Sequence, residues 1–356
     1  MHTVLAINSG STSTKLAVFD DDDGETELFH SSITHSVEDL RPFARVIDQA
    51  RLRIDCVARA LSEAGVDAAA LGGIVARGGL LKPLEGGVYR VGEAMIEDLR
   101  SSRYGEHASN LAAIIARHFA TAAGCGAFVV DPVVVDELDD VARPSGLPGI
   151  ERRSVFHALN QKSVAREVAA RMGKPYERCR FVVAHLGGGI SVGAHRDGRV
   201  VDVNNALDGD GPLSPERAGG VPAGQLVDMC FEPGRTREDM RRRLVGGGGL
   251  VGYCGTNSLA EARSSGAAAA RRAIEAMAYQ VAKEIAMHGA TLEGDVDRVV
   301  LTGGLAHDDD LVERVSARVR FLAPVEVVPG EREMVSLLRG YRAVRRGEQT
   351  AKDYTA

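Results

Sequence analysis

The stretch LAINSGSTSTKLAVFDDDDG, residues 5–24, places two short apolar runs on either side of a polar turn. The runs VLAI (4–7) and KLAVFD (15–20) are typical of β-strands, so the segment predicts a hairpin. The turn NSGSTSTK (8–15) combines a glycine, several hydroxyl side chains and Lys15, and such donors suit phosphate oxygens. An ordinary polar hairpin turn is the structural alternative. It is not a Walker loop, because GxxxxGK[ST] is absent and the chain leaves as a strand.

Two further glycine-rich loops follow apolar strands in the second half of the chain. HLGGGISVG (185–193) joins the runs FVVAHL (181–186) and ISVGAH (190–195), and LTGGLAHD (301–308) follows another apolar run. Glycines permit close approach of a ligand to the backbone. A tight bulged hairpin and relief of crowding between strand and helix are the structural alternatives. Because the second half repeats the theme of the first, the sequence predicts two domains of mixed α/β structure.

Length and composition bound the class of protein. The 356 residues suit two domains, and acidic residues outnumber basic ones by 49 to 43, which disfavours a nucleic-acid surface. The five cysteines lie far apart without a CxxC pattern, so neither disulfides nor zinc is expected. No uncharged apolar run is long enough to span a bilayer, and no basic leader precedes an apolar stretch. We therefore expect a cytoplasmic protein with no membrane or nucleic-acid partner.

Helical periodicity divides the chain further. It is predicted over four segments, 51–64, 108–123, 154–172 and 267–292, while 72–77 and 127–138 are rich in β-branched residues. Ser154 is a candidate N-cap for the third helix, and Gly173 and Pro175 are its stop signals. A domain boundary is placed near the start of that helix. The predicted ranges are 1–153 and 154–330 for the two domains and 331–356 for a C-terminal helix that packs back on the first domain.

Several charged residues are candidates for catalytic or ligand-binding roles. Arg77, between a strand and two glycines, and Arg217, in SPERAGG, have the fork geometry that suits phosphate or carboxylate. Asp131 directly follows an apolar strand, where a magnesium-associated carboxylate belongs in a phosphoryl-transfer site; a loop cap is the alternative. His107, His157 and His185 are further candidates, although a histidine without context is usually a satisfied core or surface residue.

Several long motifs give the chain a family resemblance. They are ARGGLLKPLEGGVY (76–89), GEHASN (105–110), VVDPVVVDEL (129–138), ERRSVFHALNQK (151–162), VAHLGGGISVGAH (183–195), VDVNNALDGDGPLSPERAGGVPAG (201–224), EAMAYQVAKEI (275–285) and LTGGLAHD (301–308). In them the chain resembles the butyrate kinases, a branch of the acetokinase family within the acetate and sugar kinase, hsp70 and actin superfamily. The resemblance implies an α/β fold with two similar actin-like ATPase domains, ribonuclease H-like in kind, around an interdomain nucleotide cleft.

The resemblance also implies roles for individual residues. Contacts with ATP or ADP are implied for Asn8, Ser11, Ser13, Lys15, His185, Gly187, Gly188, Gly189, Gly303 and Gly304. A Mg²⁺ site is implied for Asn8 and Asp131 with a glutamate at the start of the final helix, either Glu331 or Glu333. Catalytic roles are implied for Arg77, Asp131, His157 and Arg217, and contact with the acid for Arg77, Gly78, Gly79, His107 and Phe156.

Two departures separate the chain from acetate kinases. Where those enzymes carry RVVHGG this chain has IVARGG, so Arg77 stands in the histidine's place and its role is inferred from position. Where they carry HLGNG this chain has HLGGG, so Gly188 replaces an asparagine. At both positions the sequence resembles that of the butyrate kinases. Gly78 and Gly79 are expected to leave room for a longer acyl tail.

The predicted function is reversible transfer of phosphate from Mg-ATP to a short-chain carboxylic acid, butyrate or a branched relative, by an enzyme expected to be a homo-oligomer. A carboxylic acid is already ionised at pH 7, so no general base is needed, and the positive charges of Arg77, Arg217, His157 and Lys15 are a suitable supply. An acetate or propionate kinase is the first alternative. A non-catalytic ATP clamp of the actin or hsp70 type is the second.

Overall fold

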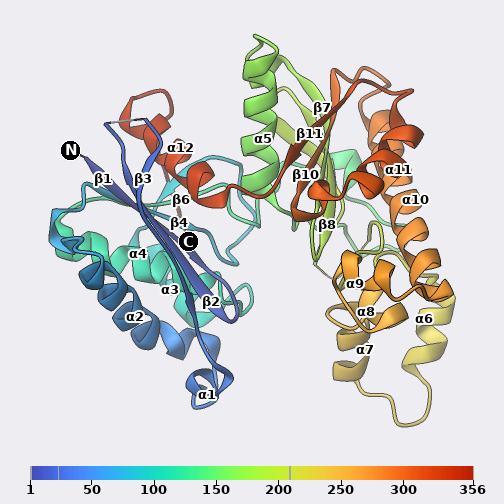
Figure 1. Ribbon diagram of the computed structural model, residues 1–356, viewed down its shortest axis with the longest axis horizontal. Helices are drawn as coiled ribbons and strands as arrows, with labels where there is room; N and C mark the ends of the chain where they lie inside the picture. Colours follow the sequence, from blue (N-terminus) through green and yellow to red (C-terminus); the bar gives the residue numbers. More distant parts are fainter. Residues whose placement is uncertain (1, 23, 208–209, 356) are drawn as a thin grey trace. The chain divides into compact units, whose positions relative to one another are not determined.

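The computed structural model describes residues 2–22, 24–207 and 210–355, and Figure 1 follows them along the chain. Asp208 and Gly209, which belong to the motif at 201–224, lie outside the described residues. The chain divides into two compact units. The first unit comprises Met1–Val135 and Arg332–Ala356, and the second comprises Asp136–Glu331. The domain ranges given by the sequence remain a prediction.

A seven-stranded sheet of order β12-β5-β6-β4-β1-β2-β3 forms the centre of the first unit. Its strands are β1 (Thr3–Ser9), β2 (Ser13–Asp20), β3 (Thr26–Thr34), β4 (Gly73–Arg77), β5 (Val88–Arg90), β6 (Ala127–Val130) and β12 (Lys352–Asp353). β1 is antiparallel to β2 but parallel to β4, which is parallel to β6. The carboxyl ends of β1, β4 and β6 therefore meet at one end of the sheet, where open α/β sheets bind ligands.

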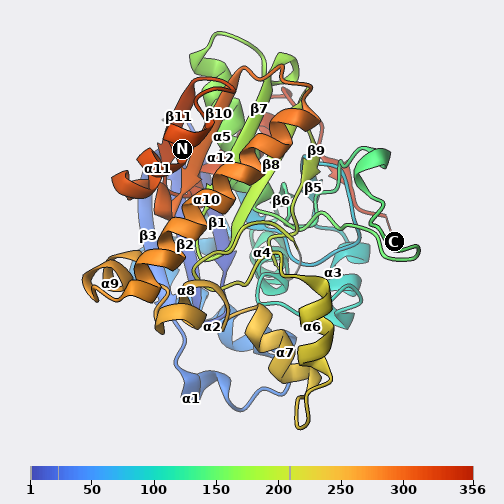
Figure 2. The same cartoon turned by 90° about the vertical axis from the view of Figure 1, so that its right-hand side faces the viewer.

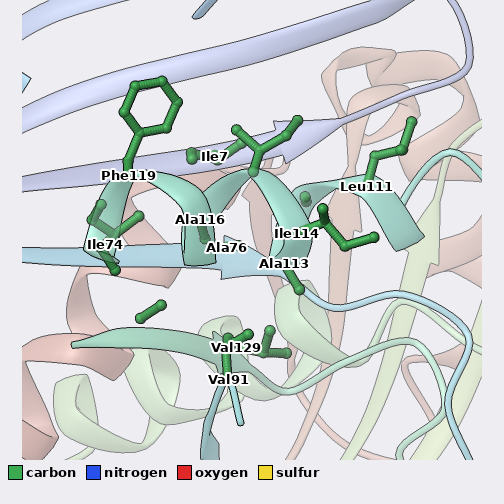
Figure 3. Close-up of a cluster of buried hydrophobic side chains, with 14 of the residues drawn as sticks. Ile7, Ile74, Ala76, Val91, Leu111, Ala113, Ile114, Ala116, Phe119 and Val129 are labelled. Carbon is green, nitrogen blue, oxygen red and sulfur yellow. The ribbon is translucent and has the colours of Figure 1, made fainter. Parts of the chain in front are cut away.

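Helices cover both faces of this sheet. They are α1 (Val37–Leu40), η1 (Val46–Gln49), α2 (Ala50–Glu63), η2 (Ala68–Ala70), α3 (Glu93–Ser101), α4 (Asn110–Ala123) and α12 (Glu333–Arg345). Ile74 of β4 packs into the core with Leu111 and Phe119 of α4, as Figure 3 shows. The preceding residue, Gly73, lies against Tyr341 of α12. Because successive strand residues point to opposite faces, α4 and α12 lie on opposite sides of the sheet.

The second unit repeats this arrangement around a five-stranded sheet of order β11-β10-β7-β8-β9. Its strands are β7 (Arg180–Leu186), β8 (Ile190–Arg196), β9 (Arg199–Val203), β10 (Arg298–Gly303) and β11 (Val325–Pro329). β7, β10 and β11 are parallel, and β8 and β9 continue the sheet in antiparallel fashion. The run β6-β4-β1-β2-β3 of the first unit has the same order and strand directions.

Helices also cover both faces of the second sheet. They are η3 (Asp140–Ala142), α5 (Ala158–Arg171), η4 (Tyr176–Arg178), α6 (Ala223–Cys230), α7 (Arg237–Leu244), α8 (Gly249–Cys254), α9 (Leu259–Ser264), α10 (Ala268–Thr291), η5 (Gly304–His307) and α11 (Asp309–Val319). Val182 of β7 packs in one core with Val281 of α10, which crosses the sheet in Figure 2. Its neighbour Phe181 packs in a second core with Val168 of α5. Each unit is thus a sheet between two layers of helices.

The hairpin, the glycine-rich loops and the four helices predicted from sequence are present in the structure, with two corrections. The predicted helix at 154–172 begins only at Ala158, and the residue before it is His157, so Ser154 is not its N-cap. The β-branched run at 127–138 stops being a strand after Val130, because the next residue, Asp131, has a φ of +36° that no strand continues. No described helix is long and apolar enough to cross a membrane.

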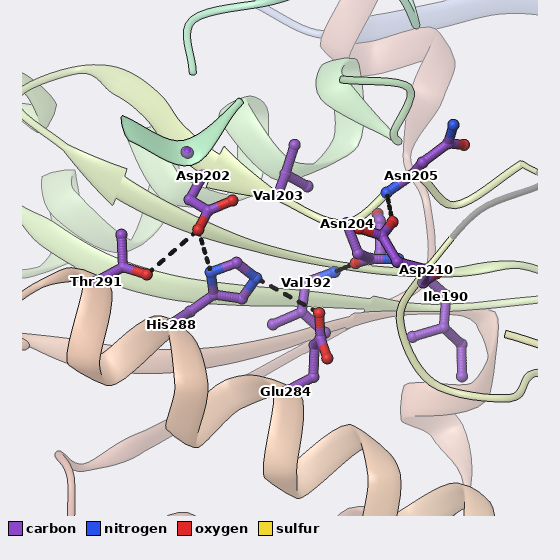
Figure 4. Close-up of polar contacts among 12 residues, drawn as sticks. Ile190, Val192, Asp202, Val203, Asn204, Asn205, Asp210, Glu284, His288 and Thr291 are labelled. Atoms are coloured by element: carbon purple, nitrogen blue, oxygen red, sulfur yellow. Dashed lines mark hydrogen bonds and ion pairs between the residues drawn. The ribbon is translucent and has the colours of Figure 1, made fainter. Parts of the chain in front are cut away.

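A partly buried polar cluster lies between β9 and α10 in the second unit (Figure 4). Arg152 donates to Asp202 at 2.7 Å and to Asp210 at 3.1 Å. The ring of His288 lies 3.9 Å from Asp202 and 3.8 Å from Glu284. Burial, with the nearby charge of Asp210, raises the pKa of Glu284 to about 7, and burial lowers the pKa of His288 to about 4. Midway between these two pKa values, therefore, both Glu284 and His288 are mostly uncharged.

This cluster makes stability depend on pH, and Glu284→Gln should remove much of that dependence. Because the folded pKa lies above the ordinary value of 4.5, the stabilisation is complete at low pH and is lost as pH rises towards 7. We expect the variant to match the wild type below the ordinary pKa and to exceed it by about 3 kcal/mol above pH 7, since one pKa unit corresponds to about 1.4 kcal/mol. Urea unfolding across this range measures the difference. Parallel pH profiles would contradict the assignment.

Candidate active site

The polar loop predicted to contact phosphates joins β1 to β2. The amide of Gly10 donates to the carbonyl of Ser13 at 2.8 Å, which closes a tight turn. Ser11 and Lys15 are exposed and Ser13 is half-buried. The hydroxyl and ammonium groups of these residues are therefore accessible to a ligand, at the carboxyl end of β1.

A buried arginine that the sequence analysis did not single out holds this loop. Nη1 of Arg53 donates to the carbonyls of Gly10 at 2.8 Å and Ser13 at 3.2 Å, and Nη2 donates to that of Ser11 at 2.9 Å. Gln49 accepts two further hydrogen bonds from the guanidinium. Among the described residues, no carboxylate forms an ion pair with Arg53, although its side chain is 0% exposed. Burial lowers its pKa, yet an arginine remains protonated at neutral pH.

The sequence did carry a signal for Arg53. The buried positions of α2 are Arg53, Val57 and Leu61, which are four residues apart and form one face of the helix. A charged residue in line with apolar ones on a buried face needs internal acceptors. The loop carbonyls supply them.

Asn8, Arg77 and Glu333 come together in the first unit. The amide nitrogen of Asn8 donates to Oε2 of Glu333, and Arg77 pairs with Oε1 of the same carboxylate at 3.0 Å. The side chains of Arg77 and Glu333 are only 26% and 13% exposed. Oδ1 of Asn8 is buried and has no hydrogen-bond partner among the described residues. Of the two glutamates that the sequence left open, Glu333 is therefore the one beside Asn8.

Asp131 follows β6 and is 1% exposed. Its carboxylate accepts from the amide of Gly87 at 2.7 Å, and its own amide donates to the carbonyl of Gly87 at 2.9 Å. These two bonds hold the unusual positive φ of Asp131. The described residues contain no group of three or more His, Cys, Asp or Glu side chains spaced to hold a metal ion. The unpartnered amide oxygen of Asn8 beside a carboxylate nevertheless fits the oxygen ligands that Mg²⁺ prefers.

Two histidines stack in the second unit. The rings of His157 and His185 lie 3.7 Å apart, with 11° between their planes. Nδ1 of His157 contacts Oγ of Ser191 at 2.9 Å, and Nδ1 of His185 contacts Oδ1 of Asn160 at 2.7 Å. Nε2 of His185 lies 3.6 Å from the carboxylate of Glu331. The structure thus joins three predicted site residues and places Glu331 with the histidines.

Arg217 lies against the glycine loop that follows β7. One Nη of its guanidinium donates to the carbonyl of Ala206. The same group occupies the space that a Cβ on Gly189 would need. Oγ of Ser214 donates to the carbonyl of Gly188 at 2.7 Å, which ties the arginine's segment to the glycine loop. Gly189 is therefore required by the position of Arg217.

This contact predicts different effects for two neighbouring glycines. An added methyl at position 189 would overlap the guanidinium of Arg217, whereas one at Gly188 would meet only the carboxylate of Glu216, at 3.4 Å. Neither glycine has a positive φ, so alanine fits both backbones. Because a misplacement of about 1 Å costs up to roughly 10²-fold in rate, we expect kcat of Gly189→Ala to fall at least about tenfold further than that of Gly188→Ala. Equal losses in the two variants would show that Arg217 does not depend on this contact.

The remaining predicted residues occupy varied positions. Gly303 has a φ of +89° and sits against the backbone of Leu186, whereas Gly304 is open. His107 is exposed, and its Nδ1 contacts the hydroxyl of Ser109 at 2.9 Å. Phe156 is buried.

The two glycines after Arg77 correct one expectation. A Cβ on Gly78 would overlap Pro132, and one on Gly79 would overlap Asn110. The space beside them is therefore filled by packing, and it is not free for an acyl tail.

Comparisons with known proteins agree with this architecture. The acetate kinase of Porphyromonas gingivalis superposes with a TM-score of 0.79 over 97% of this chain and 99% of its own, at 16% identity. The propionate kinase of Francisella tularensis subsp. tularensis gives 0.71 over 96% and 99%, at 18% identity. The acetate kinase of Entamoeba histolytica gives 0.71 over 95% and 98%, at 17% identity. The predicted α/β fold of actin-like ATPase type is thereby confirmed.

The chain shares this fold with the acetate and propionate kinases above. The profile of the acetokinase family matches residues 148–330, just over half of the chain. The chain therefore belongs to the acetokinase family, a family of carboxylate kinases.

Proposed function

We propose that the protein transfers the γ-phosphoryl group of ATP to the carboxylate of a short-chain acid, giving an acyl phosphate and ADP. In this reaction a carboxylate oxygen attacks the γ-phosphorus as the bond to the bridging oxygen of ADP breaks. No proton has to be removed, because the acid is ionised at neutral pH. The reverse reaction, from acyl phosphate and ADP to ATP, uses the same groups.

The observation that carries the proposal is the state of Glu333. Both of its carboxylate oxygens are engaged, one by Arg77 at 3.0 Å and one by Asn8. Each oxygen therefore already faces a donor, and the carboxylate has no unengaged oxygen with which to take a proton from a substrate hydroxyl. A kinase that phosphorylates a hydroxyl needs a base, whereas a carboxylate kinase needs positive charge and positioning. The pairing therefore supports a carboxylate acceptor.

The proposed roles follow from chemistry and place in the fold. The loop at residues 8–15 would bind the ATP phosphates through Ser11, Ser13 and Lys15, and Arg77 would bind the acid. Arg217 and His157 would stabilise the charge on the phosphoryl group during transfer. Asn8, Glu333 and Asp131 would hold Mg²⁺, which when bound neutralises charge on the phosphate oxygens.

Two classes of acid are candidates for the substrate. The ARGG and HLGGG motifs favour butyrate or a branched four-carbon acid. The solved relatives are acetate and propionate kinases, which favours a shorter acid. An apolar pocket distinguishes one methylene by only about 1–3 kcal/mol. We propose the four-carbon acid and keep acetate or propionate as the second candidate.

Acyl phosphate formation, trapped with hydroxylamine, tests both levels of the proposal. The enzyme is given Mg-ATP and a panel of straight and branched acids of about two to five carbons. We expect kcat/KM to peak at four carbons. A peak at two or three carbons would assign the second candidate, and turnover of ATP that does not depend on any acid would overturn the carboxylate kinase itself.

A further inference from the structure

Two consecutive amide side chains of α5, those of Asn160 and Gln161, form the hydrogen bonds that orient the stacked histidines. Asn160 contacts His185 directly, and Gln161 contacts His157 through Ser191. Both side chains are buried, and each contacts a main-chain carbonyl. A carbonyl oxygen accepts hydrogen bonds and never donates one. These carbonyls therefore determine which end of each amide is the nitrogen, and with it the positions of the protons on the neighbouring rings.

Asn160 determines the proton on His185. Its Nδ2 donates to the carbonyl of Glu331 at 3.1 Å, so its Oδ1 is the atom that faces His185. Because that oxygen only accepts, Nδ1 of His185 carries a proton. A second proton, on Nε2, would face the carboxylate of Glu331 at 3.6 Å. Of the two stacked rings, His185 is thus the one placed to carry a positive charge.

Gln161 is oriented in the same way. Its Nε2 donates to the carbonyl of Ser191 at 3.0 Å and to the hydroxyl of the same residue at 2.8 Å. Its Oε1 accepts from Nε2 of His195 at 3.0 Å, and Nδ1 of His195 accepts from the hydroxyl of Tyr176 at 2.7 Å. Burial holds the pKa of His195 well below its usual range, in keeping with a neutral ring.

The direction of the Ser191 hydroxyl is set by its neighbours. It accepts the Gln161 hydrogen bond, and the main-chain amide of His157 points to it at 3.5 Å. With both lone pairs engaged, its own proton is directed to Nδ1 of His157 at 2.9 Å. Nδ1 of His157 is therefore an acceptor, and the proton of the neutral ring is on Nε2.

We propose that Gln161 is a positioning residue that, through Ser191, fixes His157 as the Nε2–H tautomer, so that His157 acts on the phosphoryl group as a neutral hydrogen-bond donor. This role of Gln161 in catalysis rests on the proposed function of His157 at the phosphoryl group. An imidazolium at 157 would need Ser191 to accept a third hydrogen bond, and it would stack at 3.7 Å on the ring placed to carry charge. Groups that fix the tautomer of a metal-binding histidine typically matter by about 10–100-fold, and we expect an effect of this size for His157.

Histidine-labelled protein tests the proposal by NMR, because ring carbon and nitrogen shifts distinguish the two tautomers. Spectra are recorded at about pH 8, above the ordinary titration range of histidine, and the His157 signals are assigned as those missing from His157→Asn. We expect Nε2–H in the wild type. In Gln161→Leu the Ser191 hydroxyl is released to accept from the ring, so the Nδ1–H form should appear and kcat should fall about 10–100-fold, with KM for ATP little changed.

Ser191→Ala is a second variant, which removes the donor itself and keeps the main-chain carbonyl that Gln161 needs. It should lose the Nε2–H preference as well. Gln280→Leu is the matched control, since this glutamine of α10 accepts from the main-chain amide of Leu213 at 2.8 Å; its His157 signals should match the wild type. A wild-type His157 in the Nδ1–H form, or an unchanged tautomer in both variants, would overturn the proposal. The NMR result does not depend on the acid panel, so failure of the proposed function is recognised separately.

Discussion

Arg217→Lys should lower kcat for acyl phosphate formation by about 10³-fold, the size of effect that an arginine at a transferring phosphoryl group commonly has. The guanidinium is fixed by the carbonyl of Ala206 on one Nη and by the absence of a side chain at Gly189. Its planar fork of N–H donors can bond this carbonyl and a phosphoryl oxygen together. A lysine keeps the charge, but its single ammonium cannot bond Ala206 and present a second donor in the same plane.

Hydroxylamine trapping measures this loss, and thermal unfolding checks that the variant remains folded. Arg242→Lys is the matched control, because Arg242 is an exposed residue of α7 that pairs with Asp239 at 2.5 Å. Its kcat should be that of the wild type. A loss of less than about tenfold for Arg217→Lys would mean that charge alone suffices, and that the fork geometry has no part in catalysis.

The sequence predicts the fold of this chain well because its strands are short apolar runs bounded by turns and its helices have the usual helical spacing. The apolar runs at 181–186 and 190–195 and the spacing of Ile274, Met277, Val281 and Ile285 all correspond to elements of the structure. The prediction fails where a local backbone constraint overrides composition. The β-branched run after Asp131 reads as strand, but the bonds to Gly87 turn the chain there.

The candidate site is less predictable, because its partners are brought together only by the fold. Motifs identify Asn8 and His157 as single residues, yet nothing in them shows that Glu333 pairs with Arg77 or that His157 stacks on His185. The expectation that Gly79 leaves room for a substrate fails for the same reason, since Asn110 fills that space from another element. All of these contacts join residues that are far apart in the sequence, so no local pattern indicates them.

Arg53 shows how a residue outside every motif can govern one of them. Its guanidinium is buried and donates to the carbonyls of Gly10, Ser11 and Ser13, and it forms no ion pair with a carboxylate among the described residues. The carbonyl oxygens of the loop thus accept the hydrogen bonds of this charged guanidinium. A bound phosphate would add negative charge close to the same loop, so the buried cation should both shape the loop and favour an anion there.

Arg53→Met should therefore weaken both the fold and nucleotide binding. Removing a buried charge together with all its hydrogen bonds costs about 3–5 kcal/mol in comparable cases, so thermal unfolding should occur well below the wild-type temperature. Calorimetry should show at least about tenfold weaker binding of Mg-ATP, because about 1.4 kcal/mol of lost interaction corresponds to that factor. Arg53→Lys separates the two contributions, since it keeps the charge but cannot reach all three carbonyls. If Arg53→Met binds Mg-ATP as tightly as the wild type at a temperature where it is folded, the loop does not depend on Arg53 for its affinity.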